Sequence, residues 1–274
     1  MTFSILGRDP YTGELGVGVA SCVLAVGRAV PWAKAGVGVA ATQSHTRRGY
    51  GPHGLAGLEA GVTPAEVLEI LLDRDAEAQT RQVALLAADG TVAAHTGSSC
   101  IDACGHRTGE SFSVQGNMLA STAVLDAMTE AYAYTTGRLA ERLLAALDAG
   151  DSAGGDLRGR QSAALLVVGP QRLAEPWDAI PIDLRVDDAE DPIGELGRLL
   201  ALQRAYEASD TDALARLAPD GPRDLYAALD AARRGDLAGA RQALSDLRQR
   251  PGWDAWLRSN IASRRLPHLV DLLE

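Results

Sequence analysis

Two short runs that alternate glycine with branched apolar residues constrain the fold of this chain most strongly. They are LGVGVAS at 15–21 and GVGVAATQ at 36–43. A period of two predicts β-strands, and glycine inside a strand marks the close approach of another backbone or a ligand. We therefore expect two sheets that pack tightly face to face.

The remaining pattern adds strands and helices to these two runs. An apolar run at 2–8 precedes the first of them, and the Pro/Gly turn between the two predicts a hairpin. Further strands are expected at 81–87, 91–95, 111–115, 163–168 and 181–186, with a loop at 97–109. Helices are expected at 53–60, from Thr63, over 121–149 with a break at Gly137, and from 191 to about 209. The mixture indicates the α+β class.

The last quarter of the chain differs from the rest. Beyond Pro219 there is no β pattern, and the sequence is helical and rich in arginine. We expect a first domain over 1–212 and a small helical domain over 213–274.

Thr2 is the leading catalytic candidate. Because Thr2 is small, we expect a methionine aminopeptidase to remove Met1 and leave Thr2 as the first residue. An N-terminal threonine supplies a hydroxyl nucleophile and its own α-amine as the base. The amine has an unperturbed pKa of about 7.7–8.0, so part of it is neutral near pH 7. The alternative is an ordinary structural threonine, and the strand that starts at this residue favours catalysis.

The polar loop at 154–162 carries three more candidates, Asp156, Arg158 and Gln161. The planar fork of an arginine suits a carboxylate or a polarised carbonyl, with an aspartate to hold it. We expect these residues to position the amine or the substrate. A solvated loop with an internal ion pair is the alternative.

Four strand-end residues complete the predicted site. Gly116 and Asn117 close one strand, where the asparagine amide and neighbouring N–H groups are suited to an oxyanion. Ser21 and Gln43 end the two glycine-rich strands and are expected to bind substrate in the same cleft. Ordinary strand-end polar residues are the alternative for each.

Potential metal ligands gather in one short segment: His95, Cys100, Cys104 and His106. Their spacing does not match a standard zinc module, so we expect neither a metal nor another cofactor. A cysteine nucleophile with a histidine base and a disulfide between Cys100 and Cys104 stay open as alternatives. His95 is also retained as a substrate-binding candidate.

Charge and composition exclude several classes of partner. The net charge of −10 argues against nucleic acid, since phosphate binding needs a basic face. No apolar run reaches the roughly 18–20 residues of a membrane helix, and no signal peptide is expected. Three cysteines do not suggest a disulfide framework, so we expect a cytoplasmic protein. Association into a homodimer is left open.

A series of motifs resembles one family of the Ntn-hydrolase superfamily. They are TFSI at 2–5, TGELGV at 12–17, AVG at 25–27, VPWA at 30–33, ATQ at 41–43, YGP at 50–52, AHTG at 94–97, QGN at 115–117 and GDLRGRQSAAL at 155–165. That family is a domain of unknown function, often followed by a domain assigned to peptidoglycan binding, which the tail resembles. The family usually has an aromatic residue where this chain has 102–104, so Cys104 would not be part of a shared metal site.

The resemblance implies a four-layer αββα sandwich with Thr2 as the N-terminal nucleophile. Members of the superfamily mostly cleave amide bonds. The expected function is therefore hydrolysis of a C–N amide bond in a small molecule or peptide. The alternative is a non-catalytic protein on the same scaffold that binds a ligand or a cell-wall fragment.

Overall fold

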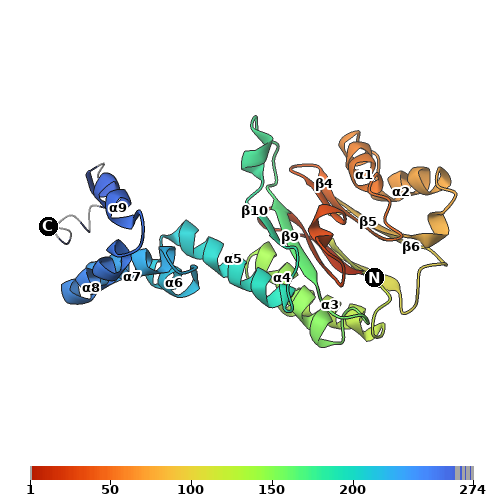
Figure 1. The fold of residues 1–274 in the computed structure, drawn as a ribbon. Helices are drawn as coiled ribbons and strands as arrows, with labels where there is room; N and C mark the ends of the chain where they lie inside the picture. The colour runs from red at the N-terminus through yellow and green to blue at the C-terminus, as the bar shows by residue number, and fades with distance from the viewer. Residues whose placement is uncertain (1, 263–265, 267–268, 270–271, 273–274) are drawn as a thin grey trace. The chain divides into compact units, whose positions relative to one another are not determined.

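Two antiparallel sheets form the first part of the molecule (Figure 1). The computed structural model describes residues 2–262, 266, 269 and 272. Within these residues, the larger sheet has six strands in the order β10 (Ile182–Val186), β9 (Ser162–Val168), β2 (Leu15–Ser21), β1 (Thr2–Arg8), β8 (Phe112–Asn117) and β7 (Gly105–Gly109). The smaller described sheet has four strands in the order β3 (Pro31–Lys34), β4 (Gly38–Ser44), β5 (Arg81–Ala87) and β6 (Val92–Thr96).

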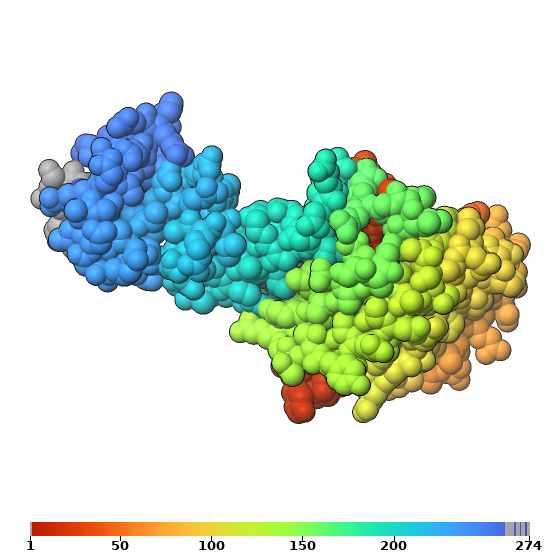
Figure 2. All heavy atoms as spheres, turned by 90° about the horizontal axis from the view of Figure 1, so that it is seen from below, coloured from red at the N-terminus to blue at the C-terminus, as the bar shows by residue number. Residues whose placement is uncertain are grey.

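Each sheet has a pair of helices on its outer face. Helices α1 (Tyr50–Glu59) and α2 (Pro64–Asp73) pack on the smaller sheet, and α3 (Ala123–Tyr134) and α4 (Leu139–Ser152) pack on the larger one. In Figure 2 the green atoms of α3 and α4 form a layer over the face that is turned to the viewer. Short 3₁₀ helices connect the strands at Val26–Arg28, Ala78–Thr80 and Pro176–Ala179. The α+β class is confirmed.

The glycine-rich strands pack differently from the prediction. Branched residues such as Val17, Val19 and Val39 fill the space between the two sheets. The glycines face outward to the helices instead: a Cβ at Gly16 would lie 2.6 Å from Leu143 Cδ1 of α4. The close approach that these glycines allow is therefore largely between sheet and helix.

Local signals place several helix ends where the sequence predicts them. Thr63 caps α2 with a complete capping box, since its side chain accepts from the Glu66 N–H while Glu66 reaches back to the Thr63 N–H. Gly137 separates α3 from α4 with a φ of 117°, a conformation that glycine adopts without a Cβ penalty.

Two strands lie where the sequence shows no strand pattern. β7 occupies the second half of the segment that is predicted to be a loop at 97–109, and it pairs with β8. β3 pairs only with β4 among the described strands. Both lie at the edge of a sheet, where one side of the strand needs no partner and apolar alternation is weak.

The described chain divides into two compact units, Met1–Gly197 and Arg198–Glu274. The division falls within α5 (Pro192–Ala208), earlier than the predicted boundary at residue 212. The second unit contains α6 (Thr211–Leu217), α7 (Pro222–Arg233), α8 (Leu237–Arg248) and α9 (Trp253–Ala262). Its core includes Leu225, Leu244 and Leu257. No helix among the described residues combines the length and the apolarity that a bilayer crossing requires.

Candidate active site

The parity of β1 directs the Thr2 side chain into the space between the two sheets. Ser4, two residues further on, donates from Oγ to Gln43 Oε1 of β4 at 2.7 Å. Phe3, between them, packs on the opposite side beside Gly150 of α4. Because side chains alternate along a strand, Thr2 shares the inner face with Ser4. Thr2 is only 5% exposed.

A buried hydrogen-bond network runs between the sheets from Thr2 inward. Gln115 Nε2 donates to Ser4 Oγ at 2.6 Å, and Ser113 Oγ donates to Gln115 Oε1 at 2.8 Å. Gln43 Nε2 donates to the Thr2 carbonyl at 3.3 Å and to Gln82 Oε1 at 2.8 Å. The four side chains of Ser4, Gln43, Gln82 and Gln115 are fully buried. Such a satisfied network fixes the position of the strand that carries Thr2.

The network also fixes the orientation of the Asn117 amide. Gln82 Nε2 donates to the carbonyls of Gly105 and Gly116 at 3.1 and 2.8 Å, so its Oε1 must be the acceptor. Asn117 therefore presents Nδ2 to Gln82 Oε1, at 2.9 Å. Asn117 Oδ1 is left buried without a hydrogen-bond partner among the described residues. A buried unpaired acceptor costs about 1–3 kcal/mol, which indicates a donor that belongs there.

Asn117 and Thr2 face each other directly. They are paired in the register of β8 and β1, and Ser21 of β2 flanks Thr2 on the other side. Ser21 Oγ lies 3.2 Å from Thr2 Oγ1, and Ser21 is 2% exposed. The structure thus brings together Thr2, Ser21 and Asn117 at one end of the larger sheet.

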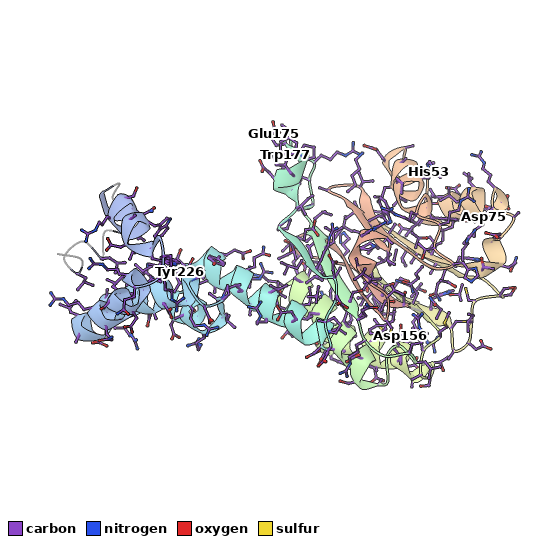
Figure 3. The ribbon with its side chains drawn as sticks, in the orientation of Figure 1. His53, Asp75, Asp156, Glu175, Trp177 and Tyr226 are labelled. Carbon is purple, nitrogen blue, oxygen red and sulfur yellow. The ribbon has the colours of Figure 1, made fainter. Side chains whose placement is uncertain are left out.

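Asp156 ties the predicted substrate loop to this end of the sheet (Figure 3). Its Oδ2 accepts from the Cys22 N–H and its Oδ1 from the Arg158 N–H, both at 2.9 Å. The Arg158 guanidinium lies 3.3 Å from the same carboxylate and is 42% exposed. The Gln161 N–H donates to the Ser21 carbonyl at 3.1 Å, while its side chain donates to Asp188 at 3.0 Å. The backbone of the loop therefore reaches the site, and the Gln161 side chain points elsewhere.

Backbone conformation also marks this end of the sheets. Met118, directly after Asn117, has a φ of 51°, and Ser44, directly after Gln43, has a φ of 69°. Residues other than glycine seldom adopt positive φ, and such strain gathers at functional sites. Met118 follows β8 and Ser44 is the last residue of β4, and the residue before each of them, Asn117 or Gln43, belongs to the network.

Two of the predicted residues hold other positions. His95 lies on the helix-covered face of β6, and its Nε2 donates to the Ala78 carbonyl at 3.1 Å. The structure therefore does not bring it to Thr2, because its neighbour Thr96 takes the inner-face position and accepts from Gln82 at 3.0 Å. Gly116 pairs with Phe3 on β1. Its carbonyl accepts a hydrogen bond from Gln82 Nε2 and does not face an open cleft.

The cysteine and histidine segment does not converge on one point. Within the described chain, no group of three or more His, Cys, Asp or Glu side chains is placed to hold a metal ion. His106 Nδ1 lies 2.9 Å from Thr96 Oγ1, and burial lowers the pKa of the His106 imidazole. Cys100 and Cys104 are free thiols, and burial raises the pKa of Cys104.

Four network residues, Ser4, Gln82, Ser113 and Gln115, are not singled out from the sequence. Their signal is a polar residue at an inward position of a buried strand, and Ser4 and Gln115 each show it within an alternating run. This signal can be recognised only when it is already known which side chains of each strand point into the core.

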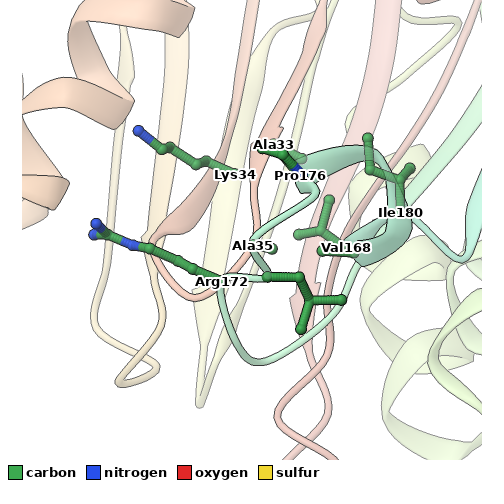
Figure 4. Close-up of a pocket in the computed structure, with 9 residues that line it drawn as sticks. Ala33, Lys34, Ala35, Val168, Arg172, Pro176 and Ile180 are labelled. Carbon is green, nitrogen blue, oxygen red and sulfur yellow. The ribbon is translucent and has the colours of Figure 1, made fainter.

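A separate cavity of about 230 Å³ lies at the opposite end of β9 (Figure 4). It is lined mainly by small and apolar side chains, including Ala33, Ala35, Val168 and Ile180. Lys34 and Arg172, on its rim, both pair with Glu59. None of its described lining side chains carries a hydroxyl or a thiol. β9 begins beside Ser21 and ends at this cavity.

Comparison with known proteins places the chain in a family. The profile of a family described as a family of unknown function, DUF1028, matches residues 2–196. The chain belongs to the DUF1028 family. The crystal structure of protein SPO2555 from Silicibacter pomeroyi, also assigned to DUF1028, is 36% identical, with a TM-score of 0.67. The similarity covers 75% of this chain and 86% of that chain. None of the curated proteins matches.

Proposed function

We propose that this DUF1028 protein is an N-terminal-threonine amidohydrolase with the four-layer αββα sandwich of the Ntn-hydrolase superfamily. The observation that carries the proposal is the pairing of Thr2 with Asn117, whose buried Oδ1 has no partner among the described residues. An amine that appears on Thr2 after removal of Met1 would supply the missing donor. The layer order of helices, two sheets and helices agrees with this scaffold.

The reaction follows from the groups at Thr2. The neutral α-amine takes the proton of the Thr2 hydroxyl as Oγ1 bonds to the amide carbon. The protonated amine then gives its proton to the leaving nitrogen, the C–N bond breaks, and an ester remains on Thr2. Water, activated by the same amine, hydrolyses the ester and restores the threonine. The substrate is an amide in a small molecule or a peptide.

The neighbours of Thr2 have distinct roles in this proposal. Asn117 Oδ1 accepts an N–H of the α-amine and orients its lone pair toward Oγ1, in place of the oxyanion role expected from the sequence. Ser21 Oγ, at 3.2 Å, exchanges a hydrogen bond with the nucleophile. Asp156 holds Arg158 and the Cys22 backbone at the rim, where the half-exposed guanidinium can meet a polar group of the substrate.

The direct test is a covalent adduct on Thr2. Protein with Thr2 as its first residue should gain one acyl mass when it is exposed to a panel of amides and lactams, and digestion should locate the mass on the N-terminal peptide. The same protein with Met1 retained has an amide in place of the base and should gain nothing. An adduct on a cysteine instead would replace the threonine mechanism.

The pH dependence of the reaction should respond to residue 117. In the unaltered protein, kcat/KM should rise with pH as the amine loses its proton, with a midpoint at about pH 7–8. In Asn117→Asp a carboxylate beside the ammonium favours the charged form, so the midpoint should move up by about 1 unit or more.

Gln171→Glu is the matched control, because it adds one negative charge on an exposed residue outside the site. Its midpoint should equal that of the unaltered protein. Equal midpoints in all three proteins would remove Asn117 from the environment of the base.

A non-catalytic binding protein is the second candidate. In the second unit, Trp253 and Trp256 lie edge to face with centroids 5.3 Å apart beside a cavity of about 250 Å³, and Trp256 is 43% exposed. Exposed aromatic faces suit a ligand with an apolar surface, such as a sugar ring of a cell-wall fragment. Retention of Met1 in the mature protein would favour this candidate over hydrolysis.

A further inference from the structure

A cavity between α1 and α2 leads to an inference that goes beyond hydrolysis. We infer that it is a binding site for a small carboxylate with an apolar body. Its lining includes Arg47, Tyr50, His53, Ile70, Leu71 and Arg74. His53 and Asp75, labelled in Figure 3, lie on the side of α1 and α2, and Asp156 lies with the other sheet.

The size of the cavity favours an organic occupant over a bare inorganic ion. Its volume is about 330 Å³. At about 30 Å³ for each water molecule, the space corresponds to roughly ten waters. That volume lies at the lower end of small-molecule sites. The occupant therefore needs an organic body in addition to its charged group.

The charges around the cavity favour an anion with one negative charge. Asp75 is buried beneath it and is bound by Arg81 at 2.8 Å and by Arg47 at 3.2 Å. Arg81 also pairs with Glu77. The charged side chains that line the cavity itself are Arg47 and Arg74, and no carboxylate is among its described lining residues. The excess positive charge is notable in a chain whose net charge is −10.

Arg74 is the cation available to a ligand. Among the described residues Arg74 forms no ion pair with a carboxylate, whereas Arg47 and Arg81 both form ion pairs with Asp75. The guanidinium fork matches a carboxylate with two parallel hydrogen bonds. His53, across the cavity on α1, adds a ring N–H donor.

The end of α2 that carries Arg74 also gives the cavity an apolar, partly uncovered surface. Ile70 is 45% exposed although it lies on the same helix as the buried Val67 and Leu68. Ile70 and Leu71 line the cavity together with Tyr50. An apolar surface beside an arginine fits a carboxylate that carries a ring or a short alkyl chain, and fits a bare phosphate poorly.

Benzoate is the probe for this site, with benzamide as its neutral counterpart and inorganic phosphate as a bare anion. Isothermal titration of the full chain should show benzoate binding with a dissociation constant below about 1 mM. Arg74→Gln should weaken it about 10-fold or more, because a charge-assisted pair is lost. Arg172→Gln, on the rim of the other cavity, should leave the constant unchanged.

The controls separate this site from the proposed active site. Thr2→Ala protein should bind benzoate as tightly as the unaltered chain, because binding here needs no nucleophile. Benzamide binding as tight as benzoate would make the cavity merely apolar, and equal binding of phosphate would make it an unspecific anion site. Either result, or an unchanged constant in Arg74→Gln, overturns the inference.

Discussion

Replacing Thr2 with alanine should lower amide hydrolysis by at least about 10³-fold, the scale seen when a covalent nucleophile is removed. The expected loss is in kcat, since the hydroxyl acts on the bound substrate. The structural cost should be small, because the substitution removes only the hydroxyl and one methyl group, and with the hydroxyl the contact with Ser21 Oγ at 3.2 Å. One such hydrogen bond contributes about 0.5–1.5 kcal/mol to stability.

Two matched variants show whether the loss is chemical. Thr2→Ser keeps the hydroxyl and the amine, so it should retain part of the activity. Ser4→Ala changes the same face of the same strand and removes bonds to Gln43 and Gln115 of 2.7 and 2.6 Å. It should cost about 1–3 kcal/mol of stability while activity stays within about 10-fold. A Thr2→Ala protein that turns over substrate like Ser4→Ala would eliminate the threonine mechanism.

Much of the sheet architecture follows from local sequence. The turn at 9–13, the tight turn at Asp89 and Gly90, and the capping box at Thr63 each specify a connection within a few residues. Because these signals are local, the hairpins of β1 with β2 and β5 with β6 are predicted correctly. The edge strands β3 and β7 lack such signals and depend on the partner strand that they meet.

The candidate site is predictable in part for the same reason. Ser21 and Asn117 are predicted beside Thr2 because each ends a strand, and antiparallel pairing brings those ends together. The position of His95 depends on strand parity, since a shift of one residue moves a side chain to the other face. The role of Gln82 depends on contacts between two sheets, which no local pattern encodes.

Asp75 should be the most sensitive acidic residue for the stability of the first unit. Its carboxylate accepts from the Tyr50 hydroxyl at 3.0 Å and from Arg81 Nε at 2.8 Å, and it is nearly fully buried. These bonds tie α1 to the start of β5. Asp75→Asn leaves the buried Arg81 guanidinium without its main partner, and we expect a loss of about 3–5 kcal/mol. Amide hydrogen exchange in β5 during urea titration measures this loss of unfolding free energy.

The same residue predicts how stability changes with pH. The hydrogen bond from Arg81, followed by those from Glu77 N–H, Arg47 and Tyr50, holds the pKa of the Asp75 carboxyl well below its usual range despite burial. A depressed pKa in the folded state stabilises the fold above the unfolded pKa of about 3.9. That contribution is lost as the pH falls through the folded pKa. The difference between unaltered protein and Asp75→Asn should therefore be constant above about pH 5 and shrink in acid.

Asp183→Asn is the control for this prediction. Asp183 also pairs with an arginine, Arg185, at 3.0 Å, but its side chain is 43% exposed. An exposed pair contributes about 0–1 kcal/mol, because water screens the charges and the long side chains lose entropy when they pair. The two substitutions make the same chemical change, so their difference isolates the effect of burial. Equal costs for both, or a cost at Asp75 that does not vary with pH, would mean that the buried carboxylate does not hold α1 and β5 together.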